Sequence, residues 1–75
     1  MFQEYDVVTL RRALADVPIP VGAEGTVLLV HDATPPVYVV EFAGDSGKPL
    51  GGDVFDIQHN DLELKIAYKD MPGPK

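Results

Sequence analysis

The amino-acid sequence predicts a single all-β domain in which five short antiparallel strands form a small barrel. The chain has 75 residues, enough for one small domain. Its apolar residues alternate or gather in short β-branched runs between Gly, Pro and Asp, and no helical three-four spacing persists over a dozen residues. One sheet of five short strands is too small to shelter both faces, so we expect it to curl and bury its inward side chains.

The first strand is predicted at residues 5–10, Tyr-Asp-Val-Val-Thr-Leu. Residues 11–21 follow as a long loop, because Pro18 and Pro20 lack the N–H donors that a ladder or a helix interior requires. One helical turn at residues 11–15 is left open. Gly22 and Gly25 bracket a turn, and Gly25 permits a backbone conformation or a close approach that a Cβ would hinder.

The strongest strand signal is the run Thr-Val-Leu-Leu-Val-His at residues 26–31. Residues 37–42 are its expected antiparallel partner, connected through residues 32–36. Alternation places Tyr38, Val40 and Phe42 on one face of this partner strand and Glu41 on the other. A glycine-rich loop is expected at residues 44–52.

The last two strands are predicted at residues 53–57 and 62–66, joined by a polar turn in which Asp61 suits the tight geometry. The domain is expected to span residues 1–67, with residues 68–75 as a flexible C-terminal tail. The expected core consists of Val8, Leu10, Val27, Leu29, Val40, Phe42, Phe55, Ile57, Leu62 and Leu64.

Charge and composition exclude several classes of function. Twelve acidic against six basic residues give a net charge of −6, which disfavours nucleic acid and anionic membranes as partners. The absence of cysteine excludes disulfides and thiolate metal sites and fits a reducing compartment. The start of the chain is acidic, without a basic leader followed by an apolar run, so we expect a cytoplasmic location.

Four segments in this order resemble a known family. They are Tyr-Asp-Val-Val at residues 5–8, Gly-Ala-Glu-Gly-Thr-Val at 22–27, Tyr-Val-Val-Glu-Phe at 38–42 and Asp-Leu-Glu-Leu at 61–64. The set resembles SH3-like barrels and, more closely, the small bacterial family known as domain of unknown function 4926 (DUF4926). This resemblance implies an SH3-like fold and no established activity. The turn at residues 22–27 is also similar to the KOW motif of ribosomal and transcription-factor domains. A more distant likeness to the SH3-like domain of the nitrile hydratase β subunit implies a structural accessory to a larger enzyme.

Residues with catalytic or metal-binding chemistry are interpreted as ordinary polar surface. His31 and His59 have neither the spacing nor the third ligand of a metal site. The aspartates of residues 53–61 lie at a strand end and a turn, which are wet, whereas acid/base catalysis requires environments that split two pKa values. Lys48 of the glycine-rich loop is followed by Pro49 and a strand rather than a helix, unlike a phosphate-binding loop. We therefore expect no catalytic residue, metal or cofactor, and no enzymatic activity.

The remaining candidates predict binding to a protein. The candidate partner contacts are Arg11, Arg12, Val17, Ile19, Val21 and Tyr38. The two arginines suit an acidic partner surface, and the apolar loop residues and surface aromatics are common interface anchors. Phe2, Tyr5 and Tyr68 either cover the barrel ends or contact a partner.

These observations favour a non-catalytic protein–protein interaction module, either an accessory subunit of an enzyme or an antidote-like small protein with an acidic binding surface. An edge strand would also allow a homo-oligomer. The alternative is an RNA- or ribosome-associated, KOW-like binding domain.

Overall fold

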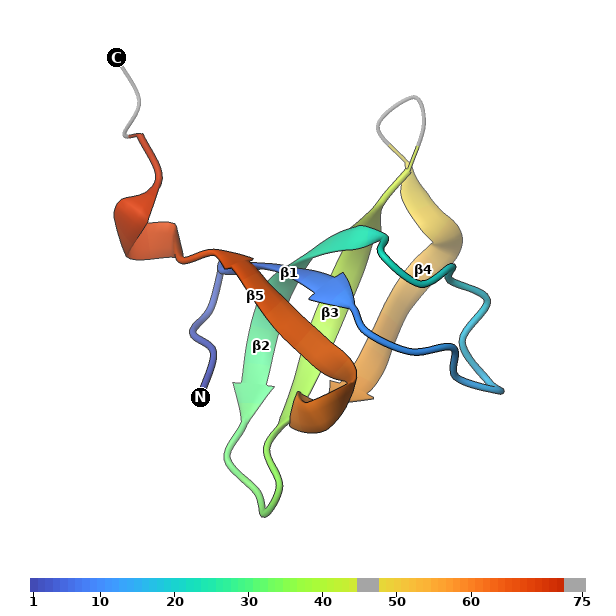
Figure 1. Cartoon of the computed structure of the whole chain (residues 1–75), viewed down its shortest axis with the longest axis horizontal. Coiled ribbons are helices and arrows are strands. Elements are labelled where there is room, and N and C mark those ends of the chain that lie inside the picture. The colour runs from blue at the N-terminus through green and yellow to red at the C-terminus, as the bar shows by residue number, and fades with distance from the viewer. Residues whose placement is uncertain (45–47, 73–75) are drawn as a thin grey trace.

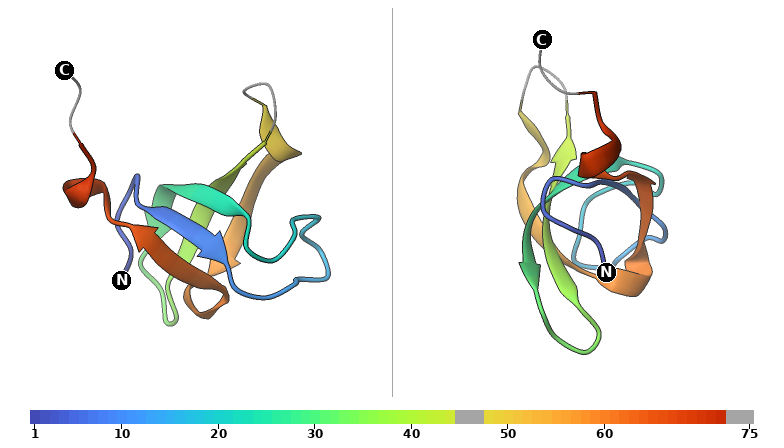
Figure 2. Two further views of the ribbon diagram at one scale, coloured as in Figure 1. Left: turned by 45° about the horizontal axis from the view of Figure 1, so that its top comes forward. Right: turned by 90° about the vertical axis from the view of Figure 1, so that its left-hand side faces the viewer.

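The computed structural model describes residues 1–44 and 48–72 and confirms the all-β class, with five antiparallel strands in one sheet (Figure 1). The strands are β1 (Val7–Leu10), β2 (Glu24–His31), β3 (Val37–Ala43), β4 (Pro49–Gln58) and β5 (Leu62–Ile66). Their order in the sheet is β4-β3-β2-β1-β5. The sheet curls, so that β1 and β5 cross over the β2–β3 hairpin instead of continuing its plane (Figure 2). Short 3-10 helices, η2 (His59–Asp61) and η3 (Tyr68–Asp70), precede and follow β5.

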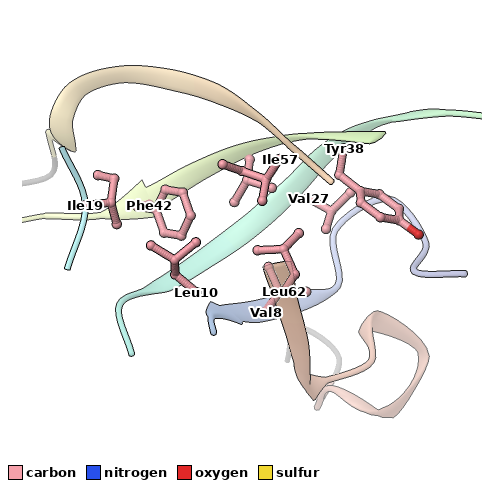
Figure 3. Close-up of a cluster of buried hydrophobic side chains, with 9 residues drawn as sticks. Val8, Leu10, Ile19, Val27, Tyr38, Phe42, Ile57 and Leu62 are labelled. Atoms are coloured by element: carbon pink, nitrogen blue, oxygen red, sulfur yellow. The ribbon is translucent and has the colours of Figure 1, made fainter. Parts of the chain in front are cut away.

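The core lies in the concave side of this curled sheet (Figure 3). Its members are Val8, Leu10, Ile19, Val27, Tyr38, Val40, Phe42, Ile57 and Leu62. The predicted alternation in β3 is confirmed, because Tyr38, Val40 and Phe42 are buried and Glu41 is exposed. Phe55, expected in the core, is half-buried and packs against it.

Leu29 was predicted in the core and is instead 46% exposed. The reason is a register shift in β2: Val27 pairs with Val40, but the next paired residue is Leu29, opposite Val39. Leu28 is the extra residue, and one extra residue moves every following side chain to the other face. Val30 takes the inward place, opposite the buried Tyr38.

Leu64 was also predicted in the core and is 45% exposed. It pairs with Val8 as the alternation requires, but it lies beyond Leu62, the last buried residue of β5. Its side chain lines a pocket near the chain ends instead of packing in the core.

The long loop between β1 and β2 contains no helical turn over residues 11–21. Leu14 to Val17 form a tight turn, in which the Val17 N–H donates to the Leu14 carbonyl oxygen at 3.2 Å. The loop then returns over the sheet, and Ile19 enters the core at 4% exposure. Leu10 closes the loop, because its carbonyl oxygen accepts from the Gly22 N–H at 2.8 Å and its N–H donates to Ala23 at 3.1 Å.

Several observed boundaries differ from the expected ones. β1 begins at Val7 and not at residue 5, and β2 begins at Glu24 and not at residue 26. Residues 49–52 belong to β4 and not to a loop; the rest of the glycine-rich segment includes residues 45–47, which lie outside the described residues. Residues 68–70, expected in a flexible tail, form η3.

Gly22 and Gly25 have different structural requirements. Gly22 has a φ of +89°, with no atom within 4 Å of a Cβ placed on it. Gly25 lies inside β2, where a Cβ would stand 2.5 Å from Val40 Cγ1 and 2.9 Å from a ring carbon of Phe42. The expectation of a close approach at Gly25 is therefore confirmed.

We predict that Gly25→Ala lowers the free energy of unfolding by about 1–3 kcal/mol, because the added methyl group overpacks the core against two fully buried side chains. Gly22→Asn is the matched comparison and should cost less, since Asn tolerates a positive φ better than most residues and has open space there. Urea denaturation of both variants measures the difference. Equal stability of the two variants would contradict the close approach.

Candidate functional site

The N-terminal turn and η3 meet at Asp6, which is 5% exposed. The Gln3 N–H donates to Asp6 Oδ2 at 2.7 Å, and the Tyr68 N–H donates to Asp6 Oδ1 at 2.8 Å. The second bond joins residues 62 positions apart. Tyr5, just before Asp6, has a φ of +71°, a backbone conformation that L side chains rarely adopt. The Asp6 carboxylate therefore ties the N-terminal turn to η3, which explains why residues 68–70 are part of the fold.

An open pocket of about 350 Å³ lies beside this carboxylate. It is lined by Met1, Gln3, Glu4, Asp6, Leu64, Ala67, Tyr68 and Lys69. Apolar side chains supply much of the wall, and Glu4 and Lys69 add one charge of each sign. The N-terminal segment, β5 and η3 together make a concave apolar site with a few polar groups.

Large exposed hydrophobic residues gather around this pocket. We call Met1, Tyr5, Leu64 and Tyr68 the terminal surface; they are between 45% and 62% exposed. Three of them line the pocket, and the Tyr5 ring lies 5.5 Å from the Tyr68 ring, centroid to centroid. Ile66, two residues beyond Leu64 in β5, is also exposed. Contiguous exposed apolar surface of this kind often marks an interaction site.

A second group of rings holds the start of the chain against the core. The Tyr38 hydroxyl accepts a hydrogen bond from the Phe2 N–H at 3.0 Å and lies 2.8 Å from His59 Nδ1. The Phe2 ring stacks on the His59 ring at a centroid distance of 4.6 Å. These contacts give the buried tyrosine hydroxyl its partners, so His59 has a structural role here.

Of the six predicted partner contacts, two are buried in the structure and the others lie around the loop of residues 11–23. Tyr38 and Ile19 are buried in the core, so neither side chain is accessible to a partner, and both expectations are corrected. Tyr38 is buried because Phe2 and His59 satisfy its hydroxyl, and Ile19 because the loop folds back over the sheet.

The other predicted contacts lie around the loop of residues 11–23, which projects at the opposite end of the molecule from the N-terminal segment and η3 (Figure 1). Arg12 Nε lies 3.2 Å from Asp61 Oδ1, which links the loop to η2. Arg11 is exposed, Val17 is half-buried and Val21 is 57% exposed. These residues do not join the terminal surface.

Other candidate chemistry is weakly supported by the geometry. Within residues 1–44 and 48–72, no three His, Asp or Glu side chains are grouped so that they could hold a metal ion. Asp53 and Asp56 are exposed. Gly44 and Lys48 line a shallow depression of about 190 Å³ together with Glu41, whose carboxylate would repel a phosphate. In the part of the chain that the structure describes, no helix has the length and apolar character needed to cross a membrane.

Comparison of the chain with known protein families, curated proteins and solved structures finds no match. The resemblance to DUF4926 therefore stays a prediction, and the site is interpreted from its own geometry.

The terminal surface was not predicted as a unit, although the sequence holds one signal for it. Asp6 is spaced by two residues from Val8 and by four from Leu10, so alternation places all three on one face, and Val8 and Leu10 are buried. Alternation thus places a carboxylate on the inward face, where burial without hydrogen-bond donors would be strongly unfavourable. Such a residue indicates that other backbone segments close over it.

We predict that Asp6→Ala lowers the free energy of unfolding by about 2 kcal/mol or more, because two hydrogen bonds to a charged group are lost. Hydrogen exchange of the Tyr68 amide should accelerate more than exchange in the core strands. The exposed Asp70→Asn, in η3 itself, is the control and should leave both quantities unchanged. Unchanged protection of the Tyr68 amide in Asp6→Ala would contradict the proposed link between the chain ends.

Proposed function

We propose that this chain is a non-catalytic protein-interaction module that binds another protein through the terminal surface. One observation carries the proposal: Met1, Tyr5, Leu64 and Tyr68 are exposed together around an open pocket at one end of the curled sheet. Tyrosine is among the residues that contribute most of the binding energy in protein interfaces, and Met is also enriched there. A cytoplasmic role as an accessory subunit or antidote-like protein fits this proposal and the absence of cysteine.

The pocket and the charge of the chain indicate the chemistry of the partner. A pocket of about 350 Å³ suits a single large apolar or aromatic side chain as an anchor. The net charge of −6 favours a partner whose surface around that anchor is basic, because complementary charge accelerates and orients association. We therefore propose a basic protein that inserts an apolar residue.

The loop at the other end of the molecule is a weaker docking site than the sequence indicated. Ile19 is buried, and Arg12 is paired with Asp61. RNA or ribosome association through the KOW-like turn is the alternative proposal. RNA binding would depend on Arg11 and Arg12, and the net charge of −6 disfavours it. It is therefore one of the outcomes that the capture experiment below distinguishes.

We predict that Tyr5→Asn combined with Tyr68→Ser reduces capture of the partner at least about tenfold, since two interface anchors are removed. Asn is chosen at position 5 because it tolerates the positive φ found there. The matched control combines Val21→Ser with Leu29→Ser, which removes similarly exposed apolar side chains away from the pocket.

The experiment is affinity capture of the tagged chain from its native cells, with nuclease treatment and mass spectrometry of the retained proteins. A stoichiometric protein that the control retains and the Tyr5/Tyr68 variant loses would support the proposal. Retention that is lost on nuclease treatment and on Arg11→Ala/Arg12→Ala substitution would instead establish the RNA alternative.

A further inference from the structure

The sheet has two edges, and the β4 edge is poorly suited to pairing with another strand. β4 begins with Pro49, and its Gly51 and Gly52 have φ values of +77° and +80°. Proline and an irregular backbone are features that protect edge strands from pairing with other chains.

The β5 edge has neither proline nor glycine, and residues 63–66 are all exposed. Its pairing with β1 is regular from Leu62 to Leu64, and its only irregularity is a shift that leaves Lys65 as the extra residue opposite Val7 and Val8. Among the residues that the structure describes, no strand pairs with the other side of β5, which therefore presents a free edge.

The pairing with β1 shows which backbone groups of β5 are free. The Arg11 N–H donates to the Asp61 carbonyl oxygen at 2.8 Å, immediately before the ladder in which Leu10 pairs with Leu62. Hydrogen-bonded and non-hydrogen-bonded pairs alternate along an antiparallel ladder. The backbone groups of Glu63 therefore point towards β1, and the N–H and C=O groups of Leu64 point away from the sheet. The Leu62 N–H is not free, because it donates to the His59 carbonyl oxygen at the end of η2.

The side chains of β5 are self-complementary about Leu64. Antiparallel pairing of two β5 strands around a two-fold axis at Leu64 places Glu63 of each copy opposite Lys65 of the other. Lys65 Nζ also bonds the Glu24 carboxylate across β1. Glu24 and Glu63 both pair with Thr9, so the ammonium group lies on the same face as Glu63.

Other registers are disfavoured by charge. An axis at Glu63 would place that carboxylate opposite its own copy, and an axis at Leu62 would place it opposite Asp61. Opposite charges directly across an antiparallel pair stabilise it, whereas like charges destabilise it. The axis at Leu64 is also the one at which outward-pointing N–H and C=O groups meet and exchange two hydrogen bonds.

We propose that a second copy of this chain pairs with the free edge of β5, in antiparallel register about a two-fold axis at Leu64. The interface is isologous, with both Leu64 side chains beside the axis and two Glu63–Lys65 pairs flanking them. The dimer proposal is based on the backbone groups and charges of the β5 edge. It does not depend on which protein binds the terminal surface. Pairing along one short strand buries little area, so a weak, concentration-dependent dimer is expected.

The test uses two charge-reversal variants, Glu63→Lys and Lys65→Glu. Each creates two like-charge pairs across the axis and should raise the dimer dissociation constant at least about tenfold over that of the natural sequence. Mixed together, the variants restore opposite charges at both positions and should form heterodimers. Sedimentation equilibrium up to about 0.5 mM measures dimer formation. Native mass spectrometry with one variant isotopically labelled identifies the heterodimer.

Glu24→Gln is the matched control, because it removes the ion pair with Lys65 within the chain and leaves β5 unchanged. It should dimerise like the natural sequence, which separates loss of that ion pair from loss of the dimer. The proposal is overturned if the natural chain stays monomeric at about 0.5 mM, or if the two reversed variants remain monomeric when mixed. The Tyr5/Tyr68 variant should still dimerise, so failure of the dimer and failure of the proposed function are distinguishable.

Discussion

The terminal surface depends on the buried carboxylate of Asp6. A charged group with so little exposure requires hydrogen-bond donors, and two backbone N–H groups from opposite ends of the chain supply them. Gln3 and Tyr68 are thereby held next to each other, and the pocket forms between them. The chain has no cysteine, so no disulfide can serve this purpose. One polar residue thus connects the N-terminal turn to η3 and holds them in a fixed arrangement.

The N-terminal segment is held at a second point, by the rings around Tyr38. Phe2 stacks on His59 and donates its N–H to the tyrosine hydroxyl, so the start of the chain is fixed against the core as well as against Asp6. Met1 is adjacent to the first anchor, and Tyr5 lies between the two. The exposure of apolar side chains on the terminal surface therefore occurs on an ordered scaffold, which lowers the entropy lost when a partner binds.

Local alternation was sufficient to predict most strands, and contacts distant in the sequence explain most of the errors. The burial of β3 alternates with a period of two, and the sequence of β5 alternates apolar with charged residues, so both strands were predicted from alternation. Leu29 was misplaced because nothing in an apolar run shows where one extra residue enters the ladder. The burial of Tyr38 depends on Phe2 and His59, and the position of Tyr68 depends on Asp6. None of these pairings follows from periodicity. Only the burial of the Asp6 carboxylate does, because Asp6 lies on the same face as the buried Val8 and Leu10.

The two proposed interactions are coupled by geometry. Leu64 lines the terminal pocket and is also the residue at the proposed two-fold axis, so pairing of two chains brings two terminal surfaces close to that axis. A partner that carries two copies of its anchor would then bind both pockets, and the second contact would form at high effective concentration. Such a partner also stabilises the dimer, because any ligand that prefers the paired state shifts the equilibrium towards it. A strand edge too short to dimerise strongly alone is therefore compatible with a tight complex once its partner is present.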